Sequence, residues 1–469
     1  MRFVMKFGGT SIGDAEAIGR AVKIINDHLQ EKHEIIVVIS ALPGVTDELA
    51  NISERAAEGN LTAIKEFLEK LQAFHQEAAN KSVQNNKVLS EINEELSRVS
   101  NELGEILRSV AHLRELTPRS KDFLLTFGEK FSAPIFCGTA KNAGLNAVWF
   151  TGGDAGITTD EHFGDANPLM ELTGRKVKAM IEPLLKEGKL PIVAGYGACS
   201  PHGIETTLGR GGSDYTATIL GASLEADEVI IWKDVDGLMT ADPKIEPNAK
   251  VIPRISYDEA SELAYFGTKA MHPKALEPVT SKQIPIRVKS SFHPSRDGTL
   301  IGSDRSVRSQ DIVKAVTLVD DVGLISVAGA GMVGLPGVAA KVFKILGDAG
   351  ISILMISQAS SEAGISFVAP MDKLQTATNK LELGLLGTEF VRDVSAESNV
   401  CVIAAVGAGM KGTRGVAARV FKAVSDSGIN VRMIAQGSSE LNISFVVARE
   451  DGYKAVRALH QEFALQNSN

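Results

Sequence analysis

The run TTLGRGGSD at 206–214 combines an arginine, several glycines, a hydroxyl group and a carboxylate in one short stretch. Backbone amides of its paired glycines, just ahead of an expected helix over 215–222, suit an anion. Arg210 can bind a carboxylate or a phosphate through two parallel hydrogen bonds, and Asp214 can orient a cation. These groups indicate phosphoryl transfer, although a glycine turn capped by Ser213 is the structural alternative.

A second anion-binding pattern lies at the start of the chain, in RFVMKFGGTS at 2–11. A short apolar strand there breaks into Gly8 and Gly9 and leads to an expected helix over 15–29. This order places amides at the C-terminal end of the strand, where α/β proteins bind phosphates. Lys6 would project from the strand end toward the same place. The stretch has neither the GKS or GKT triplet of a P-loop nor the GxGxxG of a Rossmann site.

Six motifs follow one another along the chain: KFGGTS at 6–11, SALPGVTD at 40–47, TFGEKFSAP at 126–134, TTLGRGGSDYTA at 206–217, WKDVDGLMTADPK at 232–244 and AYFGTKAMHP at 264–273. In this order they resemble the aspartate kinases (aspartokinases) of the amino acid kinase superfamily. The resemblance covers the whole chain. It implies transfer of the γ-phosphoryl group of ATP, with Mg²⁺, to the β-carboxylate of L-aspartate. The product would be 4-phospho-L-aspartate, formed in the first step towards lysine, threonine and methionine.

The resemblance also implies roles for individual residues. Lys6 would offset charge on the transferred phosphoryl group, and Asp214 would organise the lysines around the phosphates. The aspartate pocket would be formed by Ser40, Thr46, Glu129, Arg210 and Ser213. Arg210 would hold the α-carboxylate and Glu129 the ammonium group. The structural alternatives are an acid at a helix N-terminus for Glu129 and turn capping for the hydroxyl residues at 40 and 46.

The nucleotide is expected to contact eight residues: Lys6, Gly8, Gly9, Lys233, Asp234, Met239, Lys244 and Lys269. The sequence departs from many relatives here, with Lys233 in place of threonine, Met239 in place of tyrosine and Lys244 in place of arginine. Met239 can still pack against adenine, while solvent-exposed lysines are the alternative for the other two. A carboxylate nucleophile is ionised near neutral pH, so no general base is expected. Mg²⁺ would bridge phosphate oxygens with few direct protein ligands.

The C-terminal part of the chain contains an internal repeat. Residues 328–368 match 406–446 without a gap, at an offset of 78 that takes Gly331 to Gly409. Each copy reads strand, glycine turn, helix, strand, short loop, strand, and two copies are too few for a solenoid. The copies resemble ACT domains, which bind amino acids in many biosynthetic enzymes.

An amino-acid effector is expected at the repeats, with contacts from Met332, Gln358, Ser360, Gln436 and Asn442. The two glutamines follow matching strands, and each offers a donor and an acceptor. The stretches SQASSE and AQGSSE are more similar to those of threonine-sensitive kinases, so threonine is the expected effector and lysine the main alternative. A repeat that only forms a dimer interface is the structural alternative. A homo-oligomer, at least a dimer through the ACT domains, is expected in either case.

The expected fold is α/β, with an open, mostly parallel sheet sandwiched by helices and followed by two small α/β ACT domains. The catalytic domain is expected at 1–305, with a helical insertion at about 58–117, and the ACT domains at 311–390 and 391–469. Exchange of a strand between the two ACT domains is left open. Apolar residues at helical spacing predict one apolar face in each of two stretches of the insertion. The first stretch contains Leu61, Ile64, Leu68 and Leu71, and the second contains Leu89, Ile92, Leu96, Leu103, Ile106 and Leu107. Either a lid over the aspartate site or a scaffold fits this pattern.

Composition excludes several classes of protein. A net charge of −8 over 469 residues, with no block of lysine and arginine, argues against a nucleic-acid-binding protein. The longest apolar run, around 35–39, is too short to span a bilayer, and no signal peptide is expected. Cys137, Cys199 and Cys401 lie far apart without metal-ligand spacing and are expected to be free thiols. These features predict a cytoplasmic protein with no membrane or nucleic-acid partner.

Two other functions remain compatible with these patterns. One is a related kinase that acts on glutamate or carbamate, against which the TFGEK motif and the paired repeat argue. The other is a non-catalytic amino-acid sensor, against which Lys6, Arg210 and Asp214 argue, since a sensor needs no phosphoryl-transfer residues.

Overall fold

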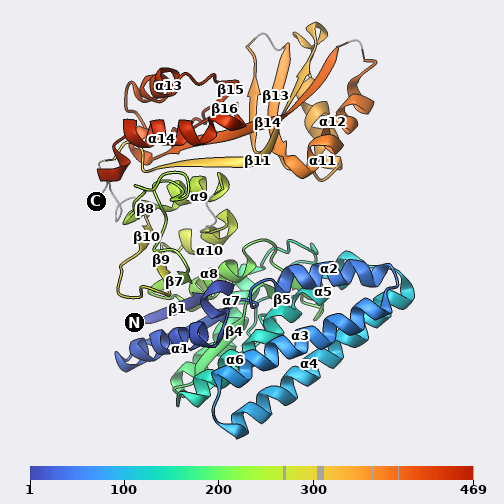
Figure 1. The fold of residues 1–469 in the computed structure, drawn as a ribbon, viewed down its shortest axis with the longest axis vertical. Helices are drawn as coiled ribbons and strands as arrows, with labels where there is room; N and C mark the ends of the chain where they lie inside the picture. The colour runs from blue at the N-terminus through green and yellow to red at the C-terminus, as the bar shows by residue number, and fades with distance from the viewer. Residues whose placement is uncertain (268–270, 304–310, 361–362, 389, 468–469) are drawn as a thin grey trace. The chain divides into compact units, whose positions relative to one another are not determined.

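The computed structural model describes residues 1–267, 271–303, 311–360, 363–388 and 390–467. The chain forms two compact units. Figure 1 shows the fold, coloured by residue number from the N-terminus to the C-terminus. The first unit consists of Met1–Leu238, Pro253–Tyr257 and Lys269–Arg308. The second consists of Met239–Ile252, Asp258–Thr268 and Ser309–Asn469.

An eight-stranded sheet forms the centre of the first unit, in the order β3-β4-β2-β1-β7-β9-β10-β8. Its strands are β1 (Arg2–Phe7), β2 (Glu34–Ile39), β3 (Ala147–Phe150), β4 (Leu190–Ala194), β7 (Glu228–Lys233), β8 (Arg254–Ser256), β9 (Ile286–Ser290) and β10 (Thr299–Gly302). Neighbouring strands pair in parallel, except for β9 with β10. The central strands are apolar along nearly their whole length, as expected when helices cover both faces of a parallel sheet. The predicted α/β class is confirmed.

The described helices of this unit are α1 (Ala15–Gln30), α2 (Val45–Ala57), α3 (Leu61–Ser82), α4 (Asn86–Leu113), α5 (Pro118–Leu125), α6 (Phe127–Asn142), α7 (Met170–Lys186), α8 (Gly212–Leu224) and α10 (Glu277–Thr280). A small hairpin, β5 (Gly197–Cys199) with β6 (Glu205–Thr207), precedes α8. Side chains alternate between the two faces of each strand. Phe3, Met5 and Phe7 of β1 therefore join one apolar core, together with α1 and α6, whereas Lys6 points to the opposite face. Helix α8, buried at every residue, packs against β1, β2 and β7.

The insertion forms an antiparallel pair of long helices, α3 and α4. Ile64, Leu71, Leu96 and Leu103 belong to the same buried core as the sheet. Leu61 departs from the expected apolar face, because it is the first residue of α3 and 47% exposed. Since the helices share the core of the sheet, the scaffold interpretation is favoured over a lid.

A six-stranded antiparallel sheet, in the order β12-β13-β11-β14-β16-β15, forms the second unit. Its strands are β11 (Ala315–Ala328), β12 (Met355–Gln358), β13 (Gly364–Pro370), β14 (Asp393–Val406), β15 (Met433–Ala435) and β16 (Asn442–Ala448). Its described helices are α9 (Tyr257–Tyr265), α11 (Val338–Asp348), α12 (Met371–Leu385), α13 (Val416–Asp426) and α14 (Gly452–Glu462). The first residue of α9, Tyr257, is assigned to the first unit.

The two repeats exchange halves of their long central strands. Residues 315–319 of β11 pair with 402–406 of β14 beside β16, whereas residues 322–328 pair with 393–400 beside β13. Val316 accordingly packs with Phe445 in the core of the second repeat, and Val394 packs with Phe367 in the core of the first. Each ACT core thus draws residues from both sides of the boundary expected near residue 390.

Two segments that precede the repeats in sequence fold with them. Ala241 and Ile245 lie in the apolar core of the second repeat, and Thr240 Oγ1 lies 3.0 Å from His460 Nε2. The expected range of the catalytic domain, 1–305, therefore includes residues that pack against the repeats.

Helix α9 is joined to the repeats by buried polar contacts. Its Glu259 forms an ion pair of 2.8 Å with Lys314 and accepts a hydrogen bond of 2.6 Å from the backbone amide of Ala408. The side chains of Glu259 and Lys314 are 1% and 4% exposed. Asn442 Nδ2, at the start of β16, donates to Glu262 of the same helix.

We expect Lys314→Ala to destabilise the second unit by about 3–5 kcal/mol, because the substitution leaves the Glu259 carboxylate buried without its counter-ion. Urea unfolding measures the loss. Lys344→Ala is the matched control, since Lys344 pairs with Asp348 on an exposed helix face and should change stability by at most ~0.5 kcal/mol. Equal effects of the two substitutions would contradict the importance of the buried pair.

Candidate active site

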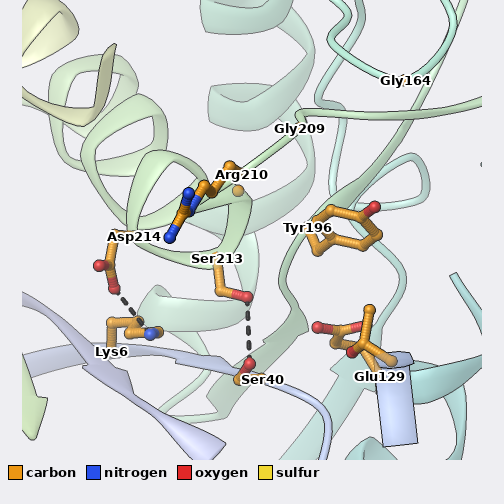
Figure 2. A pocket seen from close by; sticks show the side chains of 12 residues that line it. Lys6, Ser40, Glu129, Gly164, Tyr196, Gly209, Arg210, Ser213 and Asp214 are labelled. Atoms are coloured by element: carbon orange, nitrogen blue, oxygen red, sulfur yellow. Dashed lines mark hydrogen bonds and ion pairs between the residues drawn. The ribbon is translucent and has the colours of Figure 1, made fainter. Parts of the chain in front are cut away.

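A cavity of about 350 Å³ opens at the C-terminal ends of the central parallel strands. Its lining comes from residues far apart in the chain: Lys6, Ser40, Thr46, Glu129, Gly164, Tyr196, Gly209, Arg210, Gly211, Gly212, Ser213 and Asp214. Lys6 comes from β1, Ser40 follows β2, and Asp214 lies in the first turn of α8. Figure 2 shows these side chains around one space. The structure thus brings together the seven residues predicted for catalysis and for the aspartate pocket.

Glycines shape the loop that closes this cavity. Gly211 adopts φ 75°, in the left-handed region that glycine enters without strain, and α8 begins at the next residue. A Cβ atom on Gly211 would lie 2.6 Å from the Cβ of His272. A side chain is therefore excluded at this position by both conformation and space.

Asp214 holds two lysines at the centre of the site. Its Oδ1 lies 2.7 Å from Lys6 Nζ, and its Oδ2 lies 3.1 Å from Lys233 Nζ. Burial lowers the pKa of Lys6, against the opposing effect of the Asp214 carboxylate. Burial also acts to raise the pKa of Asp214, but the two ammonium groups outweigh it and hold that pKa below its usual value. Two ammonium groups and one carboxylate leave a net positive charge, which favours a bound anion.

Glu129 is buried in the first turn of α6, with 3% of its surface exposed. Its Oε1 accepts a hydrogen bond of 3.1 Å from the amide of Ala41, and its buried Oε2 has no hydrogen bond within 3.5 Å in the described part of the chain, although the nearby Ser213 hydroxyl favours the ionised form. Burial raises the pKa of Glu129 to about 8, although the Ala41 amide and the Lys6 charge act in the opposite direction. A carboxylate held in this way is stabilised by a cation or donor that enters the cavity.

The hydroxyl residues and the arginine complete the wall. Ser213 Oγ donates to Ser40 Oγ over 3.4 Å, and Figure 2 shows this contact between the end of β2 and the start of α8. Thr46 lies in the first turn of α2. Arg210 is exposed on the glycine loop, so its guanidinium is accessible to a ligand.

Unlike the residues predicted for the aspartate pocket, several of those expected to contact the nucleotide do not line the cavity. Lys233 joins the Asp214 cluster, whereas Asp234 is exposed and does not line the cavity. Met239 forms an isolated bridge with Val251, and Lys244 is exposed; both belong to the second unit. Lys269 lies outside the described residues.

The glycine turn after β1 differs in one respect from the expectation. The amide of Gly8 already donates to the carbonyl oxygen of Trp232 over 3.2 Å, in the neighbouring strand β7. The main chain at Gly9 passes close to that of Ala41, because a Cβ at Gly9 would lie 3.0 Å from the Ala41 carbonyl oxygen. The paired amide of Gly8 thus holds the turn against the sheet.

The residues predicted to bind an effector fall into two groups. Gln358 at the end of β12, Ser360 beyond it and Gln436 after β15 are exposed. Met332 is buried in the core of the first repeat with 2% exposed, and Asn442 is bonded to Glu262. The exposed group retains free surface for a ligand, whereas the side chain of Met332 packs inside the repeat.

Tyr196, Gly164 and Gly209 also line the cavity, although the sequence patterns did not predict them. Tyr196 follows β4, which lies next to β2 in the sheet. Because the C-terminal ends of neighbouring parallel strands meet at one edge, its position after an apolar strand was a usable signal. Gly164 is held in place by Asp122, whose buried carboxylate accepts from the amides of Gly164 and Thr207.

Comparison with protein families identifies the class. Residues 1–290 match the model of the amino acid kinase family, and residues 325–383 and 403–463 match an ACT domain model. The chain therefore belongs to the amino acid kinase family and carries ACT domains. Its relatives within the family are named aspartokinases. Aspartokinase 2 (chloroplastic) of Arabidopsis thaliana is 33% identical, over 98% of this chain and 84% of that protein.

The bifunctional aspartokinase/homoserine dehydrogenase 2 (chloroplastic) of Arabidopsis thaliana is also 33% identical, over 99% of this chain but 51% of that protein. The chain thus spans about half the length of the bifunctional relatives that it matches. Among solved structures, aspartokinase III of E. coli in complex with aspartate and ADP has a TM-score of 0.83 at 29% identity, over 98% of this chain and 99% of that one. The same enzyme with lysine and aspartate has a TM-score of 0.79 at 30% identity, over the same shares.

No helix in the part of the chain that the structure describes is both long enough and apolar enough to cross a membrane. Within the same residues, no group of three or more histidine, cysteine, aspartate or glutamate side chains is placed to hold a metal ion.

We expect Glu129→Gln to make the ligand-free protein more stable than the wild type at pH 8. Between about pH 4.5 and 8 the folded protein keeps a proton on Glu129 that the unfolded chain releases. The free energy of folding contributed by this proton is fully present below about pH 4.5 and is lost as the pH rises to about 8. Glutamine stays neutral throughout, so the gain over wild type should grow to ~1–3 kcal/mol.

Urea unfolding at a series of pH values measures this gain. Glu48→Gln, at an exposed position in the same unit, is the matched control for the loss of a carboxylate. A flat difference between Glu129→Gln and wild type from pH 5 to 8 would show that Glu129 titrates normally.

Proposed function

We propose that the protein is an aspartate kinase, which transfers the γ-phosphoryl group of MgATP to the β-carboxylate of L-aspartate to give 4-phospho-L-aspartate. The observation that carries this proposal is one cavity (Figure 2) with a positively charged cluster on one side and, on the other, a buried carboxyl group that an incoming cation would ionise. The unpaired, buried carboxylate oxygen of Glu129 lies on one side, and the Lys6–Asp214–Lys233 cluster lies on the other. A substrate with an ammonium group and an acceptor carboxylate, next to a phosphate chain, satisfies both sides.

In this proposal the pocket residues each bind one group of the amino acid. Glu129 accepts hydrogen bonds from the substrate ammonium, which replaces the missing partner of Oε2. Arg210 binds the α-carboxylate through its planar fork, so that the β-carboxylate is left to react. The hydroxyls of Ser40, Thr46 and Ser213 orient the side chain of the substrate.

The chemical step needs charge neutralisation and alignment. A β-carboxylate oxygen forms a bond to the γ-phosphorus while the bond from that phosphorus to the β,γ-bridging oxygen breaks, and ADP leaves with the electron pair. No proton has to move, because the nucleophile is already ionised. Lys6 neutralises the growing negative charge on the transferred group, and Asp214 fixes Lys6 and Lys233 in place.

The nucleotide side of the proposal rests on Lys233 and on the glycine turn after β1. Lys233 pairs with Asp214, and the Gly8 amide bonds to Trp232, the residue before Lys233, so we infer that a phosphate would lie near both. Asp234, Met239, Lys244 and Lys269 remain proposed contacts. The Asp214 carboxylate is already engaged by two lysines, so the ligands of Mg²⁺ would be phosphate oxygens and water, which suits its preference for oxygen and for retained water.

Feedback control by an amino acid at the ACT repeats is the regulatory part of the proposal, with threonine favoured over lysine. Exposed Gln358, Ser360 and Gln436 offer polar groups at matching strand ends. The segment that carries Met239 and Lys244, two of the proposed nucleotide contacts, packs in the same unit as the repeats. We also propose a homo-oligomer, at least a dimer, located in the cytoplasm, although the plant relatives are named chloroplastic.

The first experiment measures ADP release from MgATP with L-aspartate, L-glutamate or no acceptor, and repeats the aspartate reaction with added L-threonine or L-lysine. We expect turnover with aspartate that threonine suppresses. Turnover with glutamate but not with aspartate would overturn the proposed substrate. Suppression by lysine alone would keep the kinase and overturn the choice of effector.

Lys6→Ala should lower kcat by ~10³-fold, because the group that faces the transferred phosphoryl is lost. Steady-state kinetics measure the effect. Lys23→Ala is the control, since Lys23 is 75% exposed on α1 and pairs with Asp27 of its own helix. Retention of more than a tenth of kcat by Lys6→Ala would rule out the proposed role of the lysine.

A further inference from the structure

Tyr196 adopts a backbone conformation that tyrosine rarely takes. Its φ is 68°, in the left-handed region, and the amide of Gly197 donates to the carbonyl oxygen of Gly195 over 2.7 Å. A γ-turn is closed by a hydrogen bond from the amide of residue i+2 to the carbonyl oxygen of residue i. A positive φ at its central residue gives the rarer and more strained form of this turn. The glycines on either side would accept a positive φ freely, yet the tyrosine carries it. Strained residues of this kind persist where the surrounding structure holds them, and they cluster at functional sites.

The turn is tied to the first turn of α8 by a chain of hydrogen bonds. The amide of Tyr196 donates to Thr216 Oγ1 over 3.0 Å, and the Thr216 hydroxyl donates to the carbonyl oxygen of Gly212 over 2.9 Å. The amide of Leu208 donates to the carbonyl oxygen of Tyr196 over 3.0 Å. Thr216 is fully buried, so water does not compete for these bonds. The γ-turn, the strand before the glycine loop and the loop itself therefore form one connected unit.

Close packing links the same residues. A Cβ atom on Gly212 would lie 2.7 Å from Cδ2 of Tyr196, and one on Gly195 would lie 2.8 Å from the Cβ of Ser213. The ring of Tyr196 thus rests directly against the glycine loop. Figure 2 shows Tyr196 on the same side of the cavity as Glu129, away from Lys6. Burial raises the pKa of the Tyr196 hydroxyl to about 12, so the ring presents a neutral surface to the cavity.

We propose that Tyr196 is a positioning residue for the aspartate pocket, an inference that rests on the proposed kinase function. Its γ-turn, fastened by Thr216, fixes Gly212 and Ser213, and its ring forms the wall beside Glu129. The residue acts through these neighbours and contributes to binding of the amino acid rather than of the nucleotide. The strain is retained because the turn places a large ring where glycine would leave a gap.

Steady-state kinetics separate this role from a general structural one. Tyr196→Ala should raise the KM for aspartate at least tenfold while the KM for MgATP changes less than twofold. Tyr196→Phe keeps the ring and should restore most of the lost aspartate affinity. Tyr196→Gly should melt at a higher temperature than Tyr196→Ala, because glycine accepts the positive φ, yet bind aspartate no better. Tyr453→Ala, at an exposed tyrosine of α14, is the control and should change neither KM.

Hydrogen exchange of the backbone amides at 209–213 tests the positioning without any substrate. Exchange there should be at least tenfold faster in Tyr196→Ala and in Thr216→Val than in wild type, and Thr216→Ser, which keeps the hydroxyl, should largely restore protection. Unchanged exchange in both variants, or equal increases in both KM values, would overturn the proposal. Wild-type protein that fails to phosphorylate aspartate would sink the kinase function, and the exchange result would still decide the role of Tyr196.

Discussion

The buried cluster of Lys6, Asp214 and Lys233 is the constraint on which the site depends. Two ammonium groups can be buried this close together only with a carboxylate between them, because unpaired buried charge costs several kcal/mol. The three residues belong to β1, α8 and β7, so the cluster also fixes the first turn of α8 over the two central strands. Its remaining positive charge is left for an anion.

Parallel topology explains how the rest of the site is assembled. Strands β1, β2, β4 and β7 lie side by side and end at one edge, so the residues that follow them converge although they are far apart in the chain. The carboxyl group of Glu129 approaches from α6, opposite the lysines, and burial favours its neutral form until a cation or donor enters the cavity. In the proposed function the two sides together select an amino acid beside a phosphate chain, and neither side alone would do so.

The second unit shows how an internal repeat becomes one sheet. Strands β11 and β14 each run through both repeats, and each core contains strand residues from beyond its own repeat. Helix α9 and the segment at 239–252 add to the same unit through buried contacts such as Glu259 with Lys314. Residues within the range expected for the catalytic domain, 1–305, therefore pack with the repeats, so the two units do not follow the order of the sequence.

The sequence by itself determined the family, the α/β class and seven residues of the pocket, because residue type and spacing within motifs such as KFGGTS and GRGGSD are local properties. The sequence also determined the repeat, since the two copies align without a gap at a fixed offset. Tertiary structure alone decided that Lys233 joins the Asp214 cluster, that the Gly8 amide is bonded to Trp232, that Met332 is buried and that Tyr196 is strained. Each of these depends on neighbours brought together by strand pairing or helix packing, and local pattern carries no information about such contacts.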